Sequence, residues 1–293
     1  MFRNLSAALV ALFLLCLCGN SMLARDLEDI RADGVLRHLG VPYANFNTGD
    51  GHGLDVELMQ RFAASLGLRY EYVASDWNTI INDLVGKQVK PQGDAALLLG
   101  EAPVRGDIIA NGLTVLPWRQ QVLTYSSPTF PTQVWLIAAA GSSMQPITAS
   151  GSLEQDIAAV KKLLAGKSVL GKNNTCLAPE LYFLAEADAR TLDFEGGLND
   201  LAPAVIQGRA ESALLDVPDT LVALSKWPGQ IKVLGPVSEP QEMGVAFRKD
   251  SPKLHAAFED FFRTIWRDGR YRALVEKYYP DVFTYYPEFF ARP

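Results

Sequence analysis

The chain alternates strand-like and helix-like segments, and this alternation restricts the folds open to it. Residues 35–41 (VLRHLGV) and 69–74 (RYEYVA) have the apolar and β-branched character of short strands. Between them, residues 53–68 place an apolar side chain every four positions, with Asp55 near the start and Gly67 at the end. This pattern predicts an amphipathic helix, and a strand–helix–strand unit of this kind begins an α/β sheet.

The same alternation continues along the chain. Helix followed by strand is predicted for 152–171 and 198–216, and helices for 217–227, for a segment with Ser251 as N-cap and Pro252 at its first position, and for 270–279. Residues 88–105 interrupt the alternation, because Gly, Pro and charged residues flank a short apolar run, and we expect an extra hairpin there. The Tyr- and Phe-rich end of the chain, 282–293, is expected to wrap back onto the body.

The first residues indicate export. Arg3 precedes an apolar run over 5–17, small and polar residues follow it, and Ala24 is a plausible cleavage point. This is the pattern of a secretory signal peptide over residues 1–24. Cys16 and Cys18 raise the alternative of a lipoprotein, against which the bulky leucines before them argue.

Composition then limits the function classes. Removing Arg3 with the leader takes the net charge from −6 to −7, and an acidic chain without a basic stripe argues against nucleic-acid binding. The remaining chain of roughly 269 residues corresponds to one large or two ordinary domains. Its single cysteine, Cys176, cannot form an internal disulfide, so the fold depends on its apolar core.

The sequence lacks the residue patterns of several common kinds of catalytic or cofactor-binding site. His38, His52 and His255 have no acidic or thiol partners at metal-binding spacing, so neither a metal nor another cofactor is expected. The segment GKSVLGKNNT does not have the residue order of a phosphate-binding loop. Ser126 and Ser127 have no histidine near them in the sequence, which argues against a serine hydrolase.

Four segments, in this order and spacing, resemble the family 3 extracellular solute-binding proteins, the periplasmic receptors of polar amino acid ABC importers. They are GLDVELMQRFAASLGL, GDIIANGLTVLPWRQQVLTYSSPTF, GRAESALLD and the C-terminal stretch from MGVAFRKDSPKLH to EKYYP. The resemblance implies an α/β, two-lobed, periplasmic-binding-protein-like (type II) fold with two crossing hinge strands. Lobe 1 would comprise 26–132 plus 243–293, with an insertion at 88–105, and lobe 2 would comprise 133–242.

The resemblance also implies a function: a monomeric periplasmic protein, not an enzyme, that closes its lobes on a small amino acid or other carboxylate. Delivery to the membrane permease of an ABC importer would follow. Related exported proteins suggest two alternatives, a sensor or accessory protein of a periplasmic system and a dehydratase-like enzyme. The enzyme would need a general acid, for which Glu180 and Glu242 are the candidates.

The resemblance places a carboxylate clamp at Arg119. A guanidinium matches a carboxylate with two parallel hydrogen bonds and stays charged when it is desolvated. The alternative is an ion pair within the protein, since an unpaired buried charge is costly. Thr114, Asn111 and Gly112 fall at the neighbouring cradle positions, although strand propensity alone also explains a threonine.

The opposite charge falls at Asp216, the family position that holds the ligand's ammonium. Because Val217 and Pro218 follow it, Asp216 is equally suited to cap the next helix. An anion cradle at a helix start is expected at Asn174 and Thr175, where the family has glycine and threonine. Cys176 follows them, either beside the ligand or as a small buried side chain.

Aromatic residues complete the expected site. Tyr43 and Phe46 match the pair that packs over the ligand, and Trp77 falls on the same edge. Aromatic side chains are more often part of a core, so this alternative stays open for Trp77. Trp118 stands beside the arginine where the family usually has a polar residue, and it either floors the site or covers the hinge.

Overall fold

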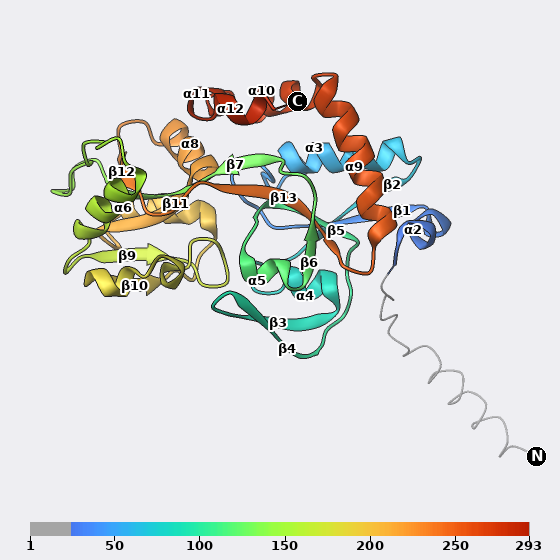
Figure 1. Cartoon of the computed structure of the whole chain (residues 1–293), viewed down its shortest axis with the longest axis horizontal. Coiled ribbons are helices and arrows are strands. Elements are labelled where there is room, and N and C mark those ends of the chain that lie inside the picture. Colours follow the sequence, from blue (N-terminus) through green and yellow to red (C-terminus); the bar gives the residue numbers. More distant parts are fainter. Residues whose placement is uncertain (1–24, 293) are drawn as a thin grey trace, which may run out of the picture.

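The structure, a computed structural model, describes residues 25–292; the predicted signal peptide lies outside them. Two separate β-sheets, each accompanied by helices, form two α/β lobes (Figure 1). We call the unit around the first sheet the first lobe and the unit around the second sheet the second lobe. A two-stranded hairpin, β3 and β4, stands apart from both sheets.

The first sheet has the strand order β2-β1-β5-β13-β6, with β7 pairing with another part of β13. Strand β1 is parallel to β2 and β5, whereas β13 is antiparallel to β5, β6 and β7. The strands are β1 (Val35–Gly40), β2 (Arg69–Ala74), β5 (Ile108–Thr114), β6 (Leu123–Tyr125), β7 (Phe130–Thr132) and β13 (Gln241–Arg248). Its helices before the second lobe are α2 (Leu27–Asp33), α3 (Leu54–Ser65), α4 (Ile80–Val85) and α5 (Pro117–Gln120). Its C-terminal helices are α9 (Pro252–Arg267), α10 (Arg270–Tyr278), α11 (Val282–Tyr285) and α12 (Pro287–Phe290).

The second sheet has the strand order β10-β9-β11-β8-β12. Strands β9, β10 and β11 run parallel, and β8 is antiparallel to β11 and β12. The strands are β8 (Val134–Ala139), β9 (Ser168–Gly171), β10 (Arg190–Asp193), β11 (Ser212–Asp216) and β12 (Ile231–Pro236). The helices are α6 (Leu153–Lys162), α7 (Leu201–Ile206) and α8 (Val217–Lys226), with the 3-10 helices η2 (Pro179–Tyr182), η3 (Leu184–Ala187) and η4 (Leu198–Asp200).

The chain passes between the sheets at two neighbouring places. It leaves the first sheet at Gln133, between β7 and β8, and returns through residues 237–240, between β12 and β13. The two passages are hydrogen-bonded to each other: the Gln133 amide donates to the Ser238 carbonyl at 2.8 Å, and the Val134 N–H donates to the Ser238 hydroxyl at 2.9 Å. Two adjacent strands therefore connect the lobes, as Figure 1 shows for β7 and β13.

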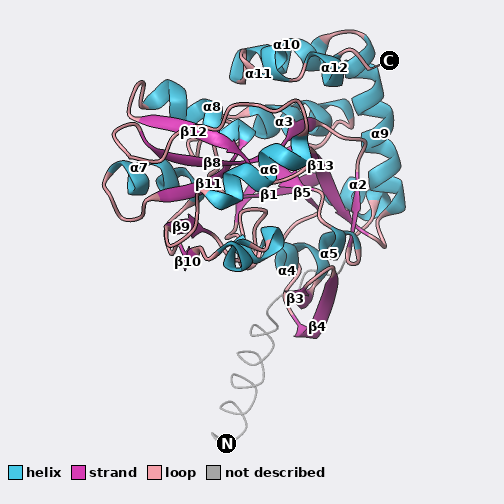
Figure 2. Cartoon of the chain, turned by 60° about the vertical axis from the view of Figure 1, so that its left-hand side comes forward, coloured by secondary structure: helices cyan, strands magenta, loops and turns pink. Residues whose placement is uncertain are grey.

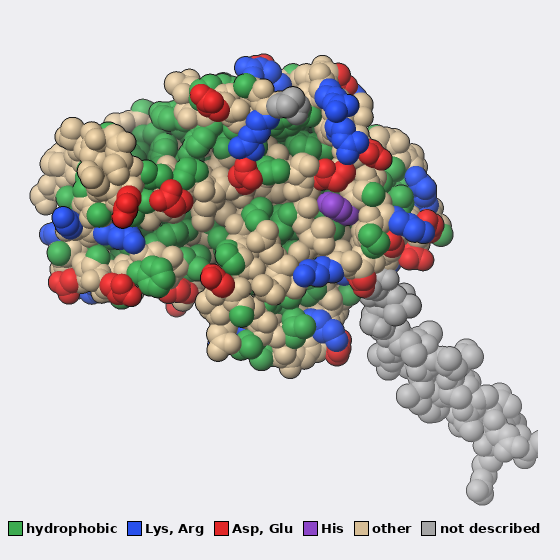
Figure 3. Space-filling view, in the orientation of Figure 1, with side chains coloured by type: hydrophobic (Ala, Val, Ile, Leu, Met, Phe, Trp, Pro, Cys, Tyr) green, Lys and Arg blue, Asp and Glu red, His purple; other side chains and the backbone are tan. Residues whose placement is uncertain are grey.

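The hairpin expected within 88–105 consists of β3 (Lys87–Gln92) and β4 (Ala95–Glu101). It lies beside α4 and α5 at the edge of the first lobe (Figure 1). Three consecutive leucines, Leu97, Leu98 and Leu99, are 39%, 59% and 62% exposed on it. Figure 3 shows apolar side chains on this part of the surface. These side chains therefore face solvent instead of adding to either core.

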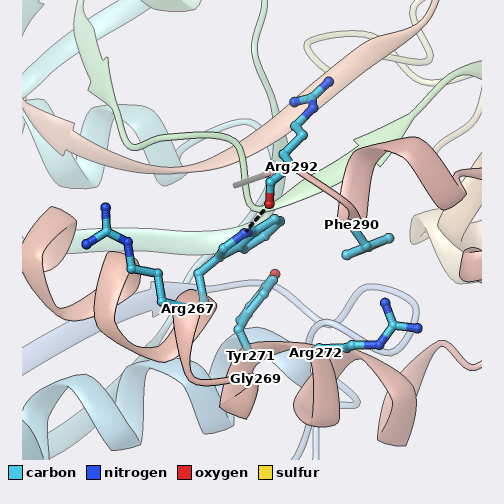
Figure 4. Close-up of a pocket in the computed structure, with 7 residues that line it drawn as sticks. Arg267, Gly269, Tyr271, Arg272, Phe290 and Arg292 are labelled. Carbon is cyan, nitrogen blue, oxygen red and sulfur yellow. Dashed lines mark hydrogen bonds between the residues drawn. The ribbon is translucent and has the colours of Figure 1, made fainter.

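The C-terminal helices pack together at one end of the molecule (Figure 2). The Trp266 indole donates a hydrogen bond to the carbonyl of Arg292 at 3.1 Å, and its ring stacks on those of Tyr271 and Phe290 (Figure 4). Phe290 also contacts Phe130 in β7. The aromatic end of the chain thus wraps back onto the first lobe, as predicted.

Ser251 occupies the N-cap position of α9 and Pro252 its first position, as predicted, but the Ser251 hydroxyl does not cap the helix. The Ser251 hydroxyl donates instead to the carbonyl of Arg25. The free N–H groups of Lys253 and Leu254 are bound by the carboxylate of Asp26, from the other end of the chain. A tertiary contact has replaced the local cap, because Asp26 supplies a charged acceptor to the helix start.

Within residues 25–292, no helix combines the length and apolar character needed to cross a membrane. In the same part of the chain, no three His, Cys, Asp or Glu side chains are grouped so that they could hold a metal ion.

Candidate functional site

Arg119 is buried between the lobes. It lies in α5, a single turn between β5 and β6, and only 2% of it is exposed. Its guanidinium donates to the carbonyl of Thr114 at 2.9 Å and, across to the second lobe, to the carbonyl of Asn174 at 3.4 Å. Nε has no partner among the described residues. The charge is therefore hydrogen-bonded only to neutral carbonyls, which leaves it suited to bind an anion.

Strand β5 contributes further polar groups beside Arg119. The Thr114 hydroxyl and the Asn111 Nδ2 are buried and, within residues 25–292, have no hydrogen-bond partner. The Asn111 Oδ1 accepts from the N–H of Val41, which fixes the amide with its NH₂ group unbound. Buried polar groups are nearly always paired in native proteins. Thr114 and Asn111 thus provide unsatisfied hydrogen-bonding groups at the predicted cradle.

Gly112 has a different position in this cradle. Its N–H donates to the Asp55 carboxylate at 2.7 Å, so this N–H is not free for a ligand. Its φ is +55°, and a Cβ there would lie 2.5 Å from the ring of Phe46. Only glycine meets both conditions, because it tolerates left-handed φ and carries no side chain. Gly112 shapes the strand behind the site.

Asp55 gives a pH dependence that can be measured. Burial raises the pKa of Asp55 from 3.8 to about 7, opposed by the Gly112 hydrogen bond. The folded state therefore binds more protons than the unfolded state between about pH 4 and 7, and this carboxyl's contribution to stability is lost as pH rises through that window. We expect Asp55→Asn to be more stable than wild type at pH 8 by on the order of 1–3 kcal/mol, but not at pH 4. Urea unfolding at both pH values measures this; equal shifts at both would contradict it.

Asp216 is completely buried at the start of α8 in the second lobe. One carboxylate oxygen accepts from the Tyr43 hydroxyl of the first lobe and, at 3.4 Å, from the N–H of Asp219. The other accepts from the Cys176 thiol at 3.5 Å. Burial raises the pKa of Asp216 to about 6, while the hydrogen bonds from Tyr43, the Asp219 backbone and Cys176 lower it. Asp216 is thus the cap of α8, as the alternative interpretation predicted, and also lies at the interface between the lobes.

The three expected aromatics are divided between this interface and the core. Tyr43 is 1% exposed and reaches Asp216, and the Trp77 ring meets its ring edge-on at 5.6 Å. Phe46 stacks behind Tyr43 and packs on Phe130 within the first-lobe core. Trp118 lies next to the guanidinium of Arg119, whose central carbon is 5.3 Å from its ring centroid. Tyr43, Trp77 and Trp118 therefore surround the buried charges, and Phe46 supports them.

The helix start expected at Asn174 and Thr175 in the second-lobe cradle lies further along the chain, at Pro179. Asn174 has the expected left-handed φ of 62°, but Pro179 begins only a four-residue 3-10 helix. The Thr175 hydroxyl donates to the Lys172 carbonyl and accepts from the Leu177 N–H, so it stabilises the turn. This local hydrogen bonding competes with helix formation. Cys176 is 6% exposed, and burial raises the pKa of its thiol to about 12, so the thiol is protonated.

We call the group formed by the buried residues Arg119, Thr114, Tyr43, Cys176 and Asp216 and the half-buried Asn174 the interlobe site. Two further hydrogen bonds join the lobes around it. The Asn174 amide donates to that of Asn78 at 2.9 Å, and the Ala44 N–H donates to Asn199 at 2.7 Å. These hydrogen bonds hold the two lobes together around the site.

Sequence reasoning missed Asp55, Asn78 and Asn199. Asp55 follows Gly53 at the start of an amphipathic helix, where an acidic residue is ordinary and its burial is not visible. Asn78 directly follows Trp77 in SDWNTII, so the neighbouring aromatic was the one available signal. The proposed general acids lie elsewhere: Glu180 is exposed, and Glu242 is paired with Arg292 at 2.7 Å.

Comparison with known proteins gives a consistent result. The sequence profile of the bacterial extracellular solute-binding proteins, family 3, matches residues 97–281. The chain is 25% identical over 252 residues to the lysine/arginine/ornithine-binding periplasmic protein of Escherichia coli K12, covering 81% of this chain and 84% of that protein. It is 24% identical over 236 residues to the membrane-bound lytic murein transglycosylase F of Desulfosudis oleivorans, covering 80% of this chain but 45% of that enzyme.

Solved structures of similar fold include a mutant of ArgBP from T. maritima, with a TM-score of 0.70 at 21% identity, covering 86% of this chain and 98% of that one. The two-lobed fold with crossing connecting strands therefore agrees with that of known binding proteins.

Proposed function

The chain belongs to the bacterial extracellular solute-binding proteins, family 3, and we propose that it binds a small carboxylate of amino-acid type between its two lobes. One observation carries the proposal: the buried guanidinium of Arg119 has only carbonyl partners among the described residues, and its Nε has none. A ligand carboxylate would accept from Nε and the terminal nitrogens and neutralise the charge. The neighbouring groups of Thr114 and Asn111 supply further contacts.

Lobe closure provides the binding mechanism. Arg119 belongs to the first lobe and Asn174, Cys176 and Asp216 to the second, so a ligand on Arg119 meets both. A ligand that contacts both lobes binds the closed form more tightly than the open form and shifts the equilibrium towards it. The lobes proposed to move are 26–132 plus 243–293 and 133–242, about the paired strands at Gln133 and Ser238.

The cellular role proposed here is capture of the ligand in the periplasm by a monomeric protein and its delivery to the permease of an ABC importer. The E. coli relative is named as a periplasmic binding protein, and this supports the location. Genes for a permease and an ATPase beside this one would support import, whereas a sensor gene in their place would support the accessory role.

Calorimetry tests the binding function directly. The chain from Arg25 onwards is titrated with free L-amino acids, their N-acetyl derivatives, short peptides and simple carboxylates, and small-angle scattering is recorded with and without the best ligand. We expect at least one carboxylate to bind near micromolar affinity, which corresponds to roughly −8 kcal/mol, and to reduce the radius of gyration. The proposal is wrong if no carboxylate binds. It is also wrong if the same ligand, with its carboxylate converted to an uncharged amide, binds as tightly.

A further inference from the structure

The interlobe site and two residues near it, Asn111 and Trp77, provide buried donors without partners, and this constrains the ligand. Arg119 Nε, Asn111 Nδ2 and Trp77 Nε1 are buried donors without a partner among the described residues. Asp216, the expected acceptor for an α-ammonium, already accepts from the Tyr43 hydroxyl, the Asp219 N–H and the Cys176 thiol. Arg119 therefore keeps an unpaired donor for a carboxylate, whereas Asp216 keeps only one of its roughly four acceptor positions, on Oδ2, for an ammonium.

A free amino acid and an acylated one make different demands on such a site. An α-ammonium carries three donors and a full charge, and burying it requires acceptors that replace its water. Asp216 has room for one further donor, on Oδ2, so the remaining donors of an ammonium would need other acceptors or the place of Tyr43 or Cys176. An amide nitrogen carries one donor and no charge, and its carbonyl adds an acceptor for the free donors. The site as built therefore favours a carboxylate whose α-nitrogen is an amide.

Asp219 does not change this balance. Its Oδ2 is buried and unpartnered among the described residues, so its charge state matters. Burial, followed by the neighbouring charge of Asp216, raises the pKa of Asp219 well above its usual range. A raised pKa favours the protonated form, in which this carboxyl is a hydrogen-bond donor.

A groove beside the interlobe site has room for the rest of such a ligand. It has a volume of about 480 Å³ and is bounded by the hairpin, α4, α5 and the second-lobe turn at Asn174. Trp77, Trp118 and Asn174 line the groove and also belong to or contact the interlobe site. The hairpin contributes Val89 and Leu99 to the outer wall. The two spaces therefore adjoin through three shared residues.

The chemistry of the groove fits a neutral peptide chain. Its two indoles and the side chains of Val89 and Leu99 offer apolar faces, and the amides of Asn78 and Asn174 can hydrogen-bond peptide groups. Of its carboxylates, Asp83 is paired with Arg105 and Glu101 with Lys87, so they do not select for a cationic ligand. Apolar walls with a few placed polar groups are typical of small-molecule sites.

Resting on the proposed function, we propose that the ligands are N-acylated amino acids, chiefly short peptides with a free C-terminal carboxylate. The carboxylate binds Arg119, the amide nitrogen lies near Asp216 without displacing Tyr43, and the N-terminal part extends between Trp77 and Trp118 into the groove beneath the hairpin.

The first test compares matched ligands by calorimetry on the wild-type chain. Each free L-amino acid is compared with its own N-acetyl derivative, and L-alanine with di- and tri-L-alanine. We expect the acylated member to bind at least about tenfold more tightly, a difference of about 1.4 kcal/mol. A free amino acid that binds as tightly as its acylated form overturns this inference but leaves the binding function intact. Failure of every carboxylate overturns the binding function itself.

The second test uses two adjacent leucines of the hairpin. Leu99 lines the groove and Leu98 does not, although their exposed fractions are similar. Leu99→Trp should fill part of the groove and weaken tri-L-alanine binding at least about tenfold, while N-acetyl-L-alanine, which is too short to reach the hairpin, keeps its affinity. Leu98→Trp, the matched control, should change neither. Equal effects of the two variants, or none on the tripeptide, would show that the groove is not part of the ligand site.

Discussion

Ligand binding should weaken at least about thirtyfold when Arg119 is replaced by alanine, since loss of a buried charge-paired contact costs ~2–5 kcal/mol. Arg119→Lys should recover only part of the loss, because an ammonium cannot make the two parallel hydrogen bonds of a guanidinium. Calorimetry with the best carboxylate ligand measures both changes. A ligand whose carboxylate has been converted to an uncharged amide should bind Arg119→Ala almost as tightly as the original ligand binds this variant.

The matched control for Arg119 is Arg263→Ala. Arg263 is an exposed arginine of α9, its side chain 55% exposed and paired with Asp260. Exposed pairs of this kind contribute about 0–1 kcal/mol to stability, so both affinity and folding should be nearly unchanged. Unaltered affinity in Arg119→Ala would remove the carboxylate clamp from the account of this protein.

The largest expected loss of stability follows replacement of Phe258 by alanine. Phe258 is fully buried in α9, and its ring lies 5.2 Å from that of Phe62 in α3 and 5.6 Å from that of Phe247 in β13, measured between centroids. Three separate elements therefore meet at one side chain. Removing it leaves a cavity at their junction, which costs about 3–5 kcal/mol.

Denaturant unfolding of the ligand-free chain measures this loss, with Phe183→Ala as the control. Phe183 is 61% exposed, so its truncation should alter the free energy of unfolding by no more than about 0.5 kcal/mol. If Phe258→Ala lowered the free energy of unfolding no more than Phe183→Ala does, α9 would not be packed on the sheet as described.

The sequence predicted the elements whose signals are local. Apolar residues at four-residue intervals predicted α3, and the structure places Leu54, Leu58 and Phe62 in the core. The apolar stripe of α9 is buried in the same manner. Periodicity succeeds here because one face of each helix must leave water to cover a sheet.

Features that depend on distant residues could not be predicted in this way. Ser251 has the residue type of an N-cap, yet Asp26 binds the helix start from 227 and 228 positions away. Asp216 and Tyr43 are 173 positions apart, and each alone has an ordinary explanation. Their hydrogen bond, which uses part of the acceptor capacity of Asp216, becomes visible only when the lobes are placed together.

The roles of individual site residues were predicted unevenly for the same reason. Resemblance to a family marks positions, and it identified Arg119 and Asp216 together with the residues around them. It does not report which hydrogen-bonding capacity is already used within this chain, as at Gly112, where Asp55 occupies the N–H, or at Thr175, whose hydroxyl bonds the turn. A residue can therefore stand at a family site position without having a hydrogen-bonding group free for the ligand.

The place of β13 makes the first sheet the later of the two to be completed along the chain. All five strands of the second sheet end by Pro236, whereas β5, β6 and β7 still need the strand that joins them, which ends at Arg248. A chain truncated before residue 241 would therefore leave strand edges of the N-terminal half unpaired, and unpaired edges favour association with other chains.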